Sequence, residues 1–144
     1  RRQLCQSPLE PLDRAEDRCQ LIGVEFYAQL VELIETGSGA PLLYLHGFAD
    51  AHGLGPDLLP FHELLAGRAR ILVPAHPGVG ASTELTDGPV IGDVAFHYLE
   101  LMDALGLATV DLVGHGPGVA FLQAGQEPGP ERRGDRCRLA KCLE

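Results

Sequence analysis

The sequence contains no tryptophan, one methionine and only 6% aromatic residues. No apolar run approaches the ~20 residues that a membrane-spanning helix needs, and the first residues lack the basic and apolar series of a secretory signal. The net charge of −9 disfavours binding to nucleic acid or to an anionic membrane surface. We therefore expect a soluble, cytoplasmic protein whose partners include neither nucleic acid nor a membrane.

Cysteine is also scarce, and its positions offer little chemistry. Two cysteines lie near each end of the chain, and no histidine follows His115 to complete a zinc set with Cys137 and Cys142. The disulfide spacings of small secreted domains are absent as well. We expect free thiols, no metal and no cofactor.

Basic residues are nearly missing from the middle of the chain. Residues 21–126 contain two basic residues against twelve acidic ones, whereas both ends carry the two signs in nearly equal numbers. A length of 144 residues fits one domain. We expect an irregular arm over residues 1–20, a folded domain over 21–126 and a charged, disordered tail over 127–144.

Strand and helix patterns alternate through this domain. Two short strands are expected within residues 21–39. Three continuous apolar runs are typical of strands buried on both faces: "APLLYLHGF", residues 71–73 at the start of "RILVPAHPGVGAS", and "ATVDLV". Helices are expected over residues 56–67, 91–105 and 117–126, the second with its apolar residues on one face. This alternation predicts an α/β fold with a mostly parallel sheet flanked by helices.

The glycine-rich turn "VGHGPGV" after the third apolar run fits two kinds of site. One is the dinucleotide-binding fingerprint G-x-G-x-x-G/A, and the other is the hydrolase elbow G-x-S-x-G. The fingerprint asks for a small residue where Val119 stands, or Phe121 in the other register, and it opens at a domain's first strand. We therefore favour the elbow, and nucleotide binding remains an alternative that dialysis with NAD would test.

Three motifs in order, "PLLYLHGF", "ILVPAHPGVGAS" and "DLVGHGPGV", resemble the start of α/β-hydrolase-fold proteins. The resemblance covers residues 21–126 and implies the first half of that fold. By this resemblance, His46 and Gly47 begin a loop in which Phe48 offers an N–H to the oxyanion hole. The elbow would comprise Gly114, His115, Gly116, Pro117 and Gly118, and a Gly-x-Gly-x-Ser loop would comprise Gly78, Gly80 and Ser82.

The sequence departs from the family pattern at the positions that carry chemistry. Gly116 stands at the nucleophile position, and Pro117 has no N–H to serve as the second oxyanion donor. The family's base histidine follows the nucleophile, but no histidine follows His115. The resemblance implies hydrolysis of ester, amide or related bonds in small apolar substrates. We expect this chain to be a truncated, catalytically silent form, and the alternative is a non-catalytic binding or interaction module.

The remaining candidates have less specific interpretations. Ala75 replaces the aspartate expected before the Gly-x-Gly-x-Ser loop, and we interpret Ser82 as structural rather than nucleophilic. Four histidines are expected at loop or helix surfaces without a catalytic role: His52, His62, His76 and His97. If the domain ends near residue 126, the "ATVDLV" strand has an open edge, which predicts self-association through that edge. The compositional break beyond it suggests out-of-frame or spliced-on sequence.

Overall fold

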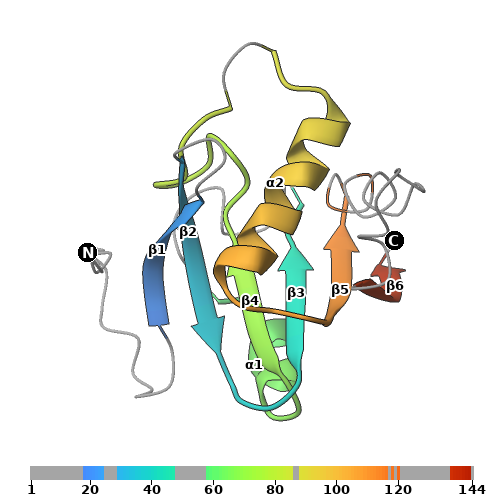
Figure 1. The fold of residues 1–144 in the computed structure, drawn as a ribbon. Coiled ribbons are helices and arrows are strands. Elements are labelled where there is room, and N and C mark those ends of the chain that lie inside the picture. Colours follow the sequence, from blue (N-terminus) through green and yellow to red (C-terminus); the bar gives the residue numbers. More distant parts are fainter. Residues whose placement is uncertain are drawn as a thin grey trace.

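The computed structural model describes residues 18–24, 29–47, 58–85, 88–116, 118, 120 and 137–143. In chain order the elements of these residues are β1 (Arg18–Val24), β2 (Gln29–Thr36), β3 (Pro41–Leu45), α1 (Pro60–Ala66), β4 (Arg70–Pro74), α2 (Ile91–Ala104), β5 (Val110–His115) and β6 (Cys137–Leu143). Figure 1 shows the six strands side by side as one twisted sheet. No helix within these ranges is long and apolar enough to cross a membrane.

The strand order in the sheet is β1-β2-β4-β3-β5-β6. β1 pairs antiparallel with β2, and β2 pairs antiparallel with β4. The other three pairings, β3 with β4, β3 with β5 and β5 with β6, are parallel. The predicted α/β class with a mostly parallel sheet is confirmed. Because β3, β4 and β5 run in one direction, the loops that follow them leave the same edge of the sheet.

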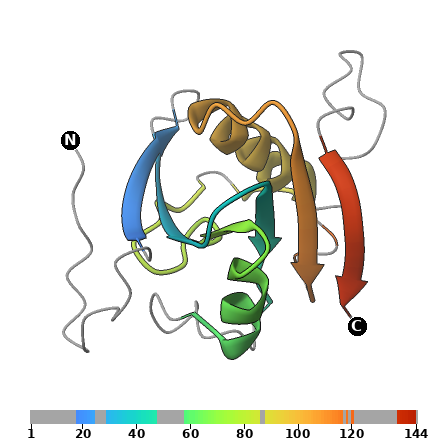
Figure 2. The same ribbon diagram turned by 90° about the horizontal axis from the view of Figure 1, so that it is seen from below.

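The two helices cover opposite faces of the sheet, as Figure 2 shows from below. Alternate residues of β3 divide between the two resulting cores, since successive side chains of a strand point to opposite faces. Leu43 and Leu45 join a core under α2, whereas Tyr44 joins a core under α1. The continuous apolar runs of the sequence are therefore explained by burial on both faces.

Helix α2 follows the predicted span closely, ending at Ala104. Its side chains at Tyr98, Leu101 and Met102 are buried against the sheet. The carboxylate of Asp93 accepts a hydrogen bond from the Val90 N–H at 2.9 Å, which satisfies a donor at the start of the helix. The expectation was wrong for Ile91, which begins the predicted apolar face but is 52% exposed.

Both ends of the predicted domain extend further than the sequence indicated. β1 begins at Arg18, inside the predicted arm, because its ladder with β2 continues to the pair Arg18↔Glu35. Residues 137–143 form β6, so the prediction of a disordered tail is wrong for this segment. β6 pairs with the outer edge of β5, where it satisfies backbone groups that would otherwise be unpaired. The open edge expected at β5 is therefore covered by the chain itself.

Candidate functional site at the carboxyl edge of the sheet

Three predicted motifs meet where the parallel strands end. The His46–Gly47 pair follows β3, His76 is the second residue after β4, and Gly116 follows β5 directly. Register pairs place Leu45 beside Gly114, so the end of β3 lies next to the elbow. Open α/β sheets place their ligand sites at this edge.

The turn after β5 has the tight geometry of an elbow. Gly116 adopts a φ of +56°, in the left-handed region that favours glycine. Two residues on, a Cβ at Gly118 would lie 2.2 Å from the carbonyl oxygen of Leu45. Gly118 therefore lets the chain after the turn approach the backbone of β3, and residues 118 and 120 are helical.

Gly47 allows a second close approach, between the end of the segment that follows β3 and the turn after β5. A Cβ at Gly47 would lie 2.9 Å from Nδ1 of His115, and a Cβ at Gly116 would lie 3.7 Å from Cα of Gly47. The structure thus brings together the predicted His-Gly pair and the predicted elbow. Phe48 and Pro117, the two positions expected to face the oxyanion, lie outside the described residues, so their roles stay predictions.

The Gly78–Ser82 loop is anchored to β2 rather than directed into the site. Its glycines Gly78 and Gly80 have φ values of +77° and +57°. The buried Ser82 hydroxyl donates to the Ala75 carbonyl at 2.9 Å and accepts from the Glu32 N–H at 3.0 Å. Both contacts are to backbone, which agrees with the structural interpretation of Ser82.

Glu32 also supports this loop, and the sequence alone did not identify it. Its carboxylate is buried at 4% exposure and accepts the Ala81 N–H at 2.6 Å. A Cβ at Gly80 would lie 2.3 Å from the same carboxylate, so the glycine makes room for it. The carboxylate comes from β2, while the position of the expected aspartate holds Ala75. The available signal was an acidic residue inside the apolar run "QLVELIE".

A histidine network, defined as His46, His76 and Tyr98, links α2 to two strand ends. The rings of His46 and His76 stack with centroids 3.8 Å apart. The His76 N–H donates to Nε2 of His46 at 3.1 Å, which leaves the proton of the neutral His46 ring on Nδ1, 3.1 Å from the Gly47 carbonyl. His76 returns a hydrogen bond from Nε2 to the His46 carbonyl at 2.7 Å.

Tyr98 completes this network from helix α2. Its hydroxyl hydrogen-bonds Nδ1 of His76, the nitrogen that carries no proton when Nε2 donates. Burial raises the pKa of Tyr98 well above its ordinary value, so the phenol stays protonated and can donate. His76 thus lies in a loop, as expected, but its part-buried ring contacts His46 and Tyr98.

The expectation of a surface position is wrong for His62 and His97. His62 is 2% exposed, and its Nδ1 accepts the Leu59 N–H at 3.1 Å. His97 is 1% exposed, and neither of its ring nitrogens has a hydrogen-bond partner. Burial lowers the pKa of His97 from 6.5 to about 4. Both side chains belong to the folded interior, and His52 lies outside the described residues.

Comparison with known proteins identifies the fold of the chain. No protein-family model matches the sequence, and no curated protein matches it. Solved structures do match. A proposed acyltransferase from Salmonella enterica is 27% identical with a TM-score of 0.70, covering 92% of this chain and 42% of its own. A bacterial membrane phospholipase A is 21% identical, with a TM-score of 0.71 and coverages of 90% and 41%.

An epoxide hydrolase from Vigna radiata is 22% identical with a TM-score of 0.70, covering 90% of this chain and 40% of its own. The chain forms the N-terminal part of an α/β-hydrolase fold. It spans about two fifths of the length of these structures. The resemblance that rested on three short motifs is confirmed at the level of the fold.

The family resemblance assigns the nucleophile position to Gly116, which has no side chain. Gly116 has a φ of +56° at the end of β5, and among the described residues a Cβ there would meet Gly47, at 3.7 Å. The described residues therefore leave room for a small side chain at this point of the turn.

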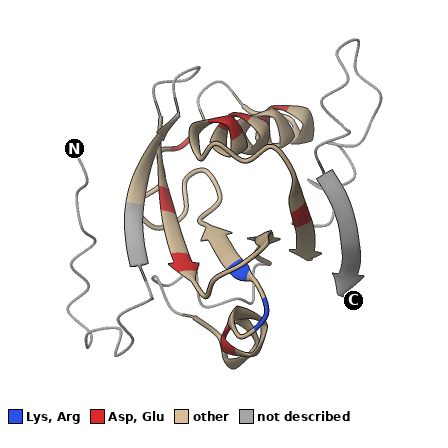
Figure 3. Cartoon of the chain, turned by 60° about the horizontal axis from the view of Figure 1, so that its bottom comes forward, with Lys and Arg blue, Asp and Glu red and all other residues tan. Residues whose placement is uncertain are grey.

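The described side chains offer neither a metal set nor a basic patch at the α/β-hydrolase site. Within the described part of the chain, no group of three or more His, Cys, Asp or Glu residues could hold a metal ion. Figure 3 shows the basic residues of the described chain, in blue, together near α1 and the start of β4, and acidic residues, in red, on α1, α2, β2 and β5. These basic residues are Arg68 and Arg70, at the opposite end of β4 from the site.

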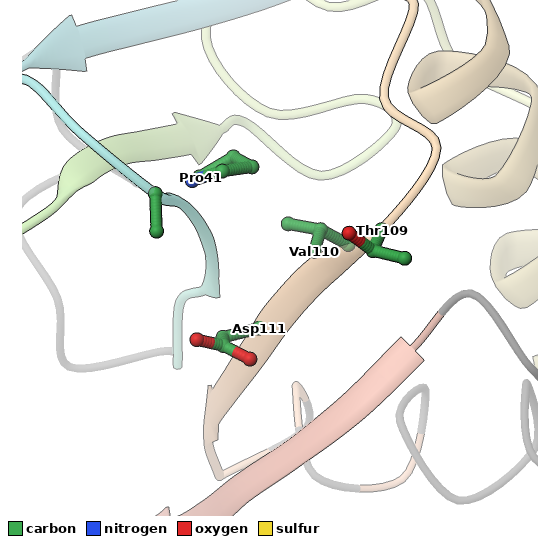
Figure 4. Close-up of a pocket in the computed structure, with 5 residues that line it drawn as sticks. Pro41, Thr109, Val110 and Asp111 are labelled. Atoms are coloured by element: carbon green, nitrogen blue, oxygen red, sulfur yellow. The ribbon is translucent and has the colours of Figure 1, made fainter.

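One small pocket lies at that opposite edge, away from the α/β-hydrolase elbow. It has a volume of about 80 Å³ and is lined by Ala40, Pro41, Thr109, Val110 and Asp111, at the beginnings of β3 and β5 (Figure 4). Ligand pockets for small organic molecules are usually about 300–1,000 Å³. Its size and its place at the amino-terminal ends of the strands argue against a substrate site there.

Proposed function

We propose that this chain is an α/β-hydrolase-fold protein that does not carry out nucleophilic hydrolysis through its elbow. The observation that carries the proposal is Gly116 at the turn after β5, with a φ of +56° and no side chain. Acyl transfer by this route needs a nucleophile that a neighbouring base can deprotonate, and glycine cannot supply one.

The hydroxyl of the neighbouring loop does not replace the missing nucleophile. Ser82 is 8% exposed, and its Oγ is engaged with the backbone of Ala75 and Glu32. A hydroxyl held in this way would have to break two buried hydrogen bonds before it could attack a substrate. This geometry supports the proposal independently of what lies beyond the described residues.

The sequence after the elbow supports the same conclusion. The family resemblance assigns the second oxyanion donor to residue 117, which is proline and has no N–H. Removing one such donor typically lowers the rate by about 10²–10³. The substrates of the family, by resemblance, are small apolar molecules with an ester, amide or related bond, and the similar structures include an esterase and a haloalkane dehalogenase.

Hydrolysis of activated esters tests the proposal directly. We expect the wild-type chain and Gly116→Ala to hydrolyse short p-nitrophenyl esters at the same rate, without a burst and without saturation. Any residual rate would come from imidazoles that act without a binding site. It should rise linearly with protein concentration and persist after denaturation in both variants. Saturable turnover by the wild-type chain would contradict the proposal.

A second candidate function is the binding of a small ligand at the elbow without turnover. Among the described residues, the space beside Gly116 is bordered within 4 Å by Gly47, at 3.7 Å from a built Cβ, so these residues leave room for a ligand atom where family members hold a side chain. Titration with a short-chain carboxylic ester would shift the amide resonances of Gly47 and Gly116 if this site binds. Unchanged resonances at millimolar ester would exclude this second candidate and leave the first intact.

A further inference from the structure

The histidine network uses all four ring nitrogens of two stacked histidines in hydrogen bonds. His46 accepts at Nε2 and donates at Nδ1, while His76 donates at Nε2 and receives the Tyr98 hydroxyl at Nδ1. Three separate segments are tied together in this way: the end of β3, the loop after β4 and helix α2. The hydrogen bonds are compatible only with particular protonation states of the rings.

We propose that the histidine network is a proton-operated latch on the candidate site. While His46 is neutral, it holds the Gly47-bearing end of β3 to the loop after β4. Protonation of His46 places an N–H at Nε2, opposite the N–H of His76 that this nitrogen now accepts. The two donors repel and this hydrogen bond is lost, which removes one of the two hydrogen bonds described between the end of β3 and the loop, while the bond from His76 Nε2 to the His46 carbonyl remains.

The two histidines differ in how they respond to a proton. A proton on Nδ1 of His76 leaves the network intact, because the Tyr98 hydroxyl can turn and accept instead of donating. His46 has no such escape, because its partner at Nε2 is a backbone N–H that can only donate. The stacked rings, 3.8 Å apart, also disfavour a second positive charge once one ring is protonated.

Release of the latch would alter the candidate site because Gly47 is part of both. The Gly47 carbonyl accepts from His46, and its Cα faces the elbow at Gly116. A change in the orientation of this segment would move the His-Gly loop relative to the elbow. The latch thus couples the protonation of His46 to the spacing between Gly47 and Gly116.

Other ionisable groups surround the network on each element packed against it. His115 of β5 lies beside Gly47, His97 of α2 packs its ring against Tyr98, and Glu32 of β2 holds the loop that follows His76. The Glu84 side chain lies near Gly78 in the same loop. All four ring nitrogens of the network are already engaged with each other's segments or with Tyr98, so the latch predicts an acid response that belongs to His46 and survives changes at His115.

Amide hydrogen exchange of the full chain tests the latch at the bond that protonation breaks. We expect the protection factor of the His76 N–H, corrected for intrinsic exchange, to fall by at least about tenfold between pH 7.5 and pH 5, the loss expected for one hydrogen bond. The amide of Val73, within the β2–β4 ladder, is the internal reference for global opening. In His46→Gln the introduced amide oxygen accepts without titrating, so protection should persist at pH 5.

The matched control is His115→Gln, which should retain the wild-type acid response at the His76 amide. Equal protection of that amide at both pH values in the wild-type chain would overturn the proposal, as would the same loss in His46→Gln. If His46→Gln does not fold, ¹⁵N spectra of the wild-type histidine rings decide the question. The latch requires the Nδ1–H form of His46 at pH 7.5, and the Nε2–H form would overturn it.

Discussion

At the scale of single residues, three glycines of the site serve different purposes. Gly47 and Gly118 are places where two backbones approach, since a Cβ would lie 2.9 Å from His115 at one and 2.2 Å from Leu45 at the other. Gly116 differs because, among the described residues, a Cβ there would come no closer than 3.7 Å, to Gly47, so that its φ of +56° is what favours glycine. We propose that the nucleophile position lacks a side chain although the described residues leave room for one.

This difference predicts unequal effects of alanine at two neighbouring glycines. Gly116→Ala should lower the free energy of unfolding by about 1–2 kcal/mol, the cost of a left-handed conformation for a residue with a Cβ. Gly118→Ala should lower it by about 3 kcal/mol or more, because the new methyl group meets a backbone carbonyl that cannot move aside. Urea unfolding of the two variants measures the difference. Equal losses would show that the elbow is not built as described.

Two buried histidines of the interior differ in whether their nitrogens are satisfied. His62 accepts a backbone N–H, whereas both nitrogens of His97 are without a partner and its pKa is lowered to about 4. In the unfolded chain the His97 ring takes up a proton near pH 6.5, its ordinary value, and in the folded chain it resists doing so. The free energy of unfolding is therefore not reduced by His97 above pH 6.5, and this residue lowers it as the pH falls toward 4.

We expect the His97 contribution to this loss to reach about 3 kcal/mol at pH 4, at about 1.4 kcal/mol per pH unit. His97→Leu should remove it, giving a flatter dependence of stability on pH, and should raise stability at pH 7.5 by about 1 kcal/mol because two unpaired nitrogens are gone. Denaturant unfolding from pH 7.5 to pH 4 measures both effects.

His62→Leu is the control for that prediction and should act with the opposite sign. It leaves the Leu59 N–H without its acceptor, so stability at pH 7.5 should fall by about 1 kcal/mol. If His97→Leu retained the acid dependence of the wild-type chain, the buried, unpaired state of His97 would be contradicted.

At the scale of elements, the loop after β4 is fixed by hydrogen bonds to β2. Ser82 supplies a buried hydrogen bond and the Glu32 carboxylate a part-buried one, and the Thr83 Oγ1 accepts an exposed hydrogen bond from the Leu30 N–H. This anchoring holds His76 at the edge of the sheet where the histidine network forms. The loop therefore links the antiparallel part of the sheet to the candidate site.

Replacing Ser82 and Thr83 of this loop by alanine, one at a time, should distinguish the stability contributions of buried and exposed hydrogen bonds. Ser82→Ala leaves the Glu32 N–H and the Ala75 carbonyl without a buried partner and should cost about 2 kcal/mol. Thr83→Ala removes an exposed bond that water can replace and should cost about 0.5 kcal/mol. Thermal unfolding of both variants compares them. A larger loss for Thr83→Ala would contradict the description of the loop.

The elements that the sequence predicted well are those with local signals. The apolar runs at Ile71–Val73 and Leu42–Leu45 and the one-sided pattern of α2 depend on residues a few positions apart, so their periodicity is visible without a structure. β6 was missed because its strand state depends on pairing with the distant β5 and not on its own alternation. Glu32 was missed for the same reason, since its partner at Ala81 lies 49 residues away.

Only the parts of the candidate site that belong to a sequence motif were predictable. The family resemblance of the motifs implied that His46–Gly47 and the elbow at Gly116 belong to one site, and the structure places them together. Nothing in the sequence indicated that His76 would stack on His46 or that Tyr98 would bond to it. Such contacts follow from how α2 lies across the sheet, which depends on the packing of the whole domain.

At the scale of the whole molecule, the parallel strands turn three separated motifs into one site. The sheet order matches the N-terminal part of an α/β-hydrolase fold, and the chain covers about two fifths of the similar structures. Its carboxyl edge has the elbow and the His-Gly pair in contact, with a histidine network behind them. Fold alone does not assign an activity, so the chemistry rests on what residue 116 offers.

The central claim is that the elbow is present without a nucleophile. The most direct measurement is intact mass spectrometry of the folded chain after incubation with a fluorophosphonate that labels activated serines, beside a known serine hydrolase as positive control. We predict that the mass of this chain remains unchanged while the control is fully labelled. A stoichiometric adduct on the chain would show an activated hydroxyl at the site and would contradict the account.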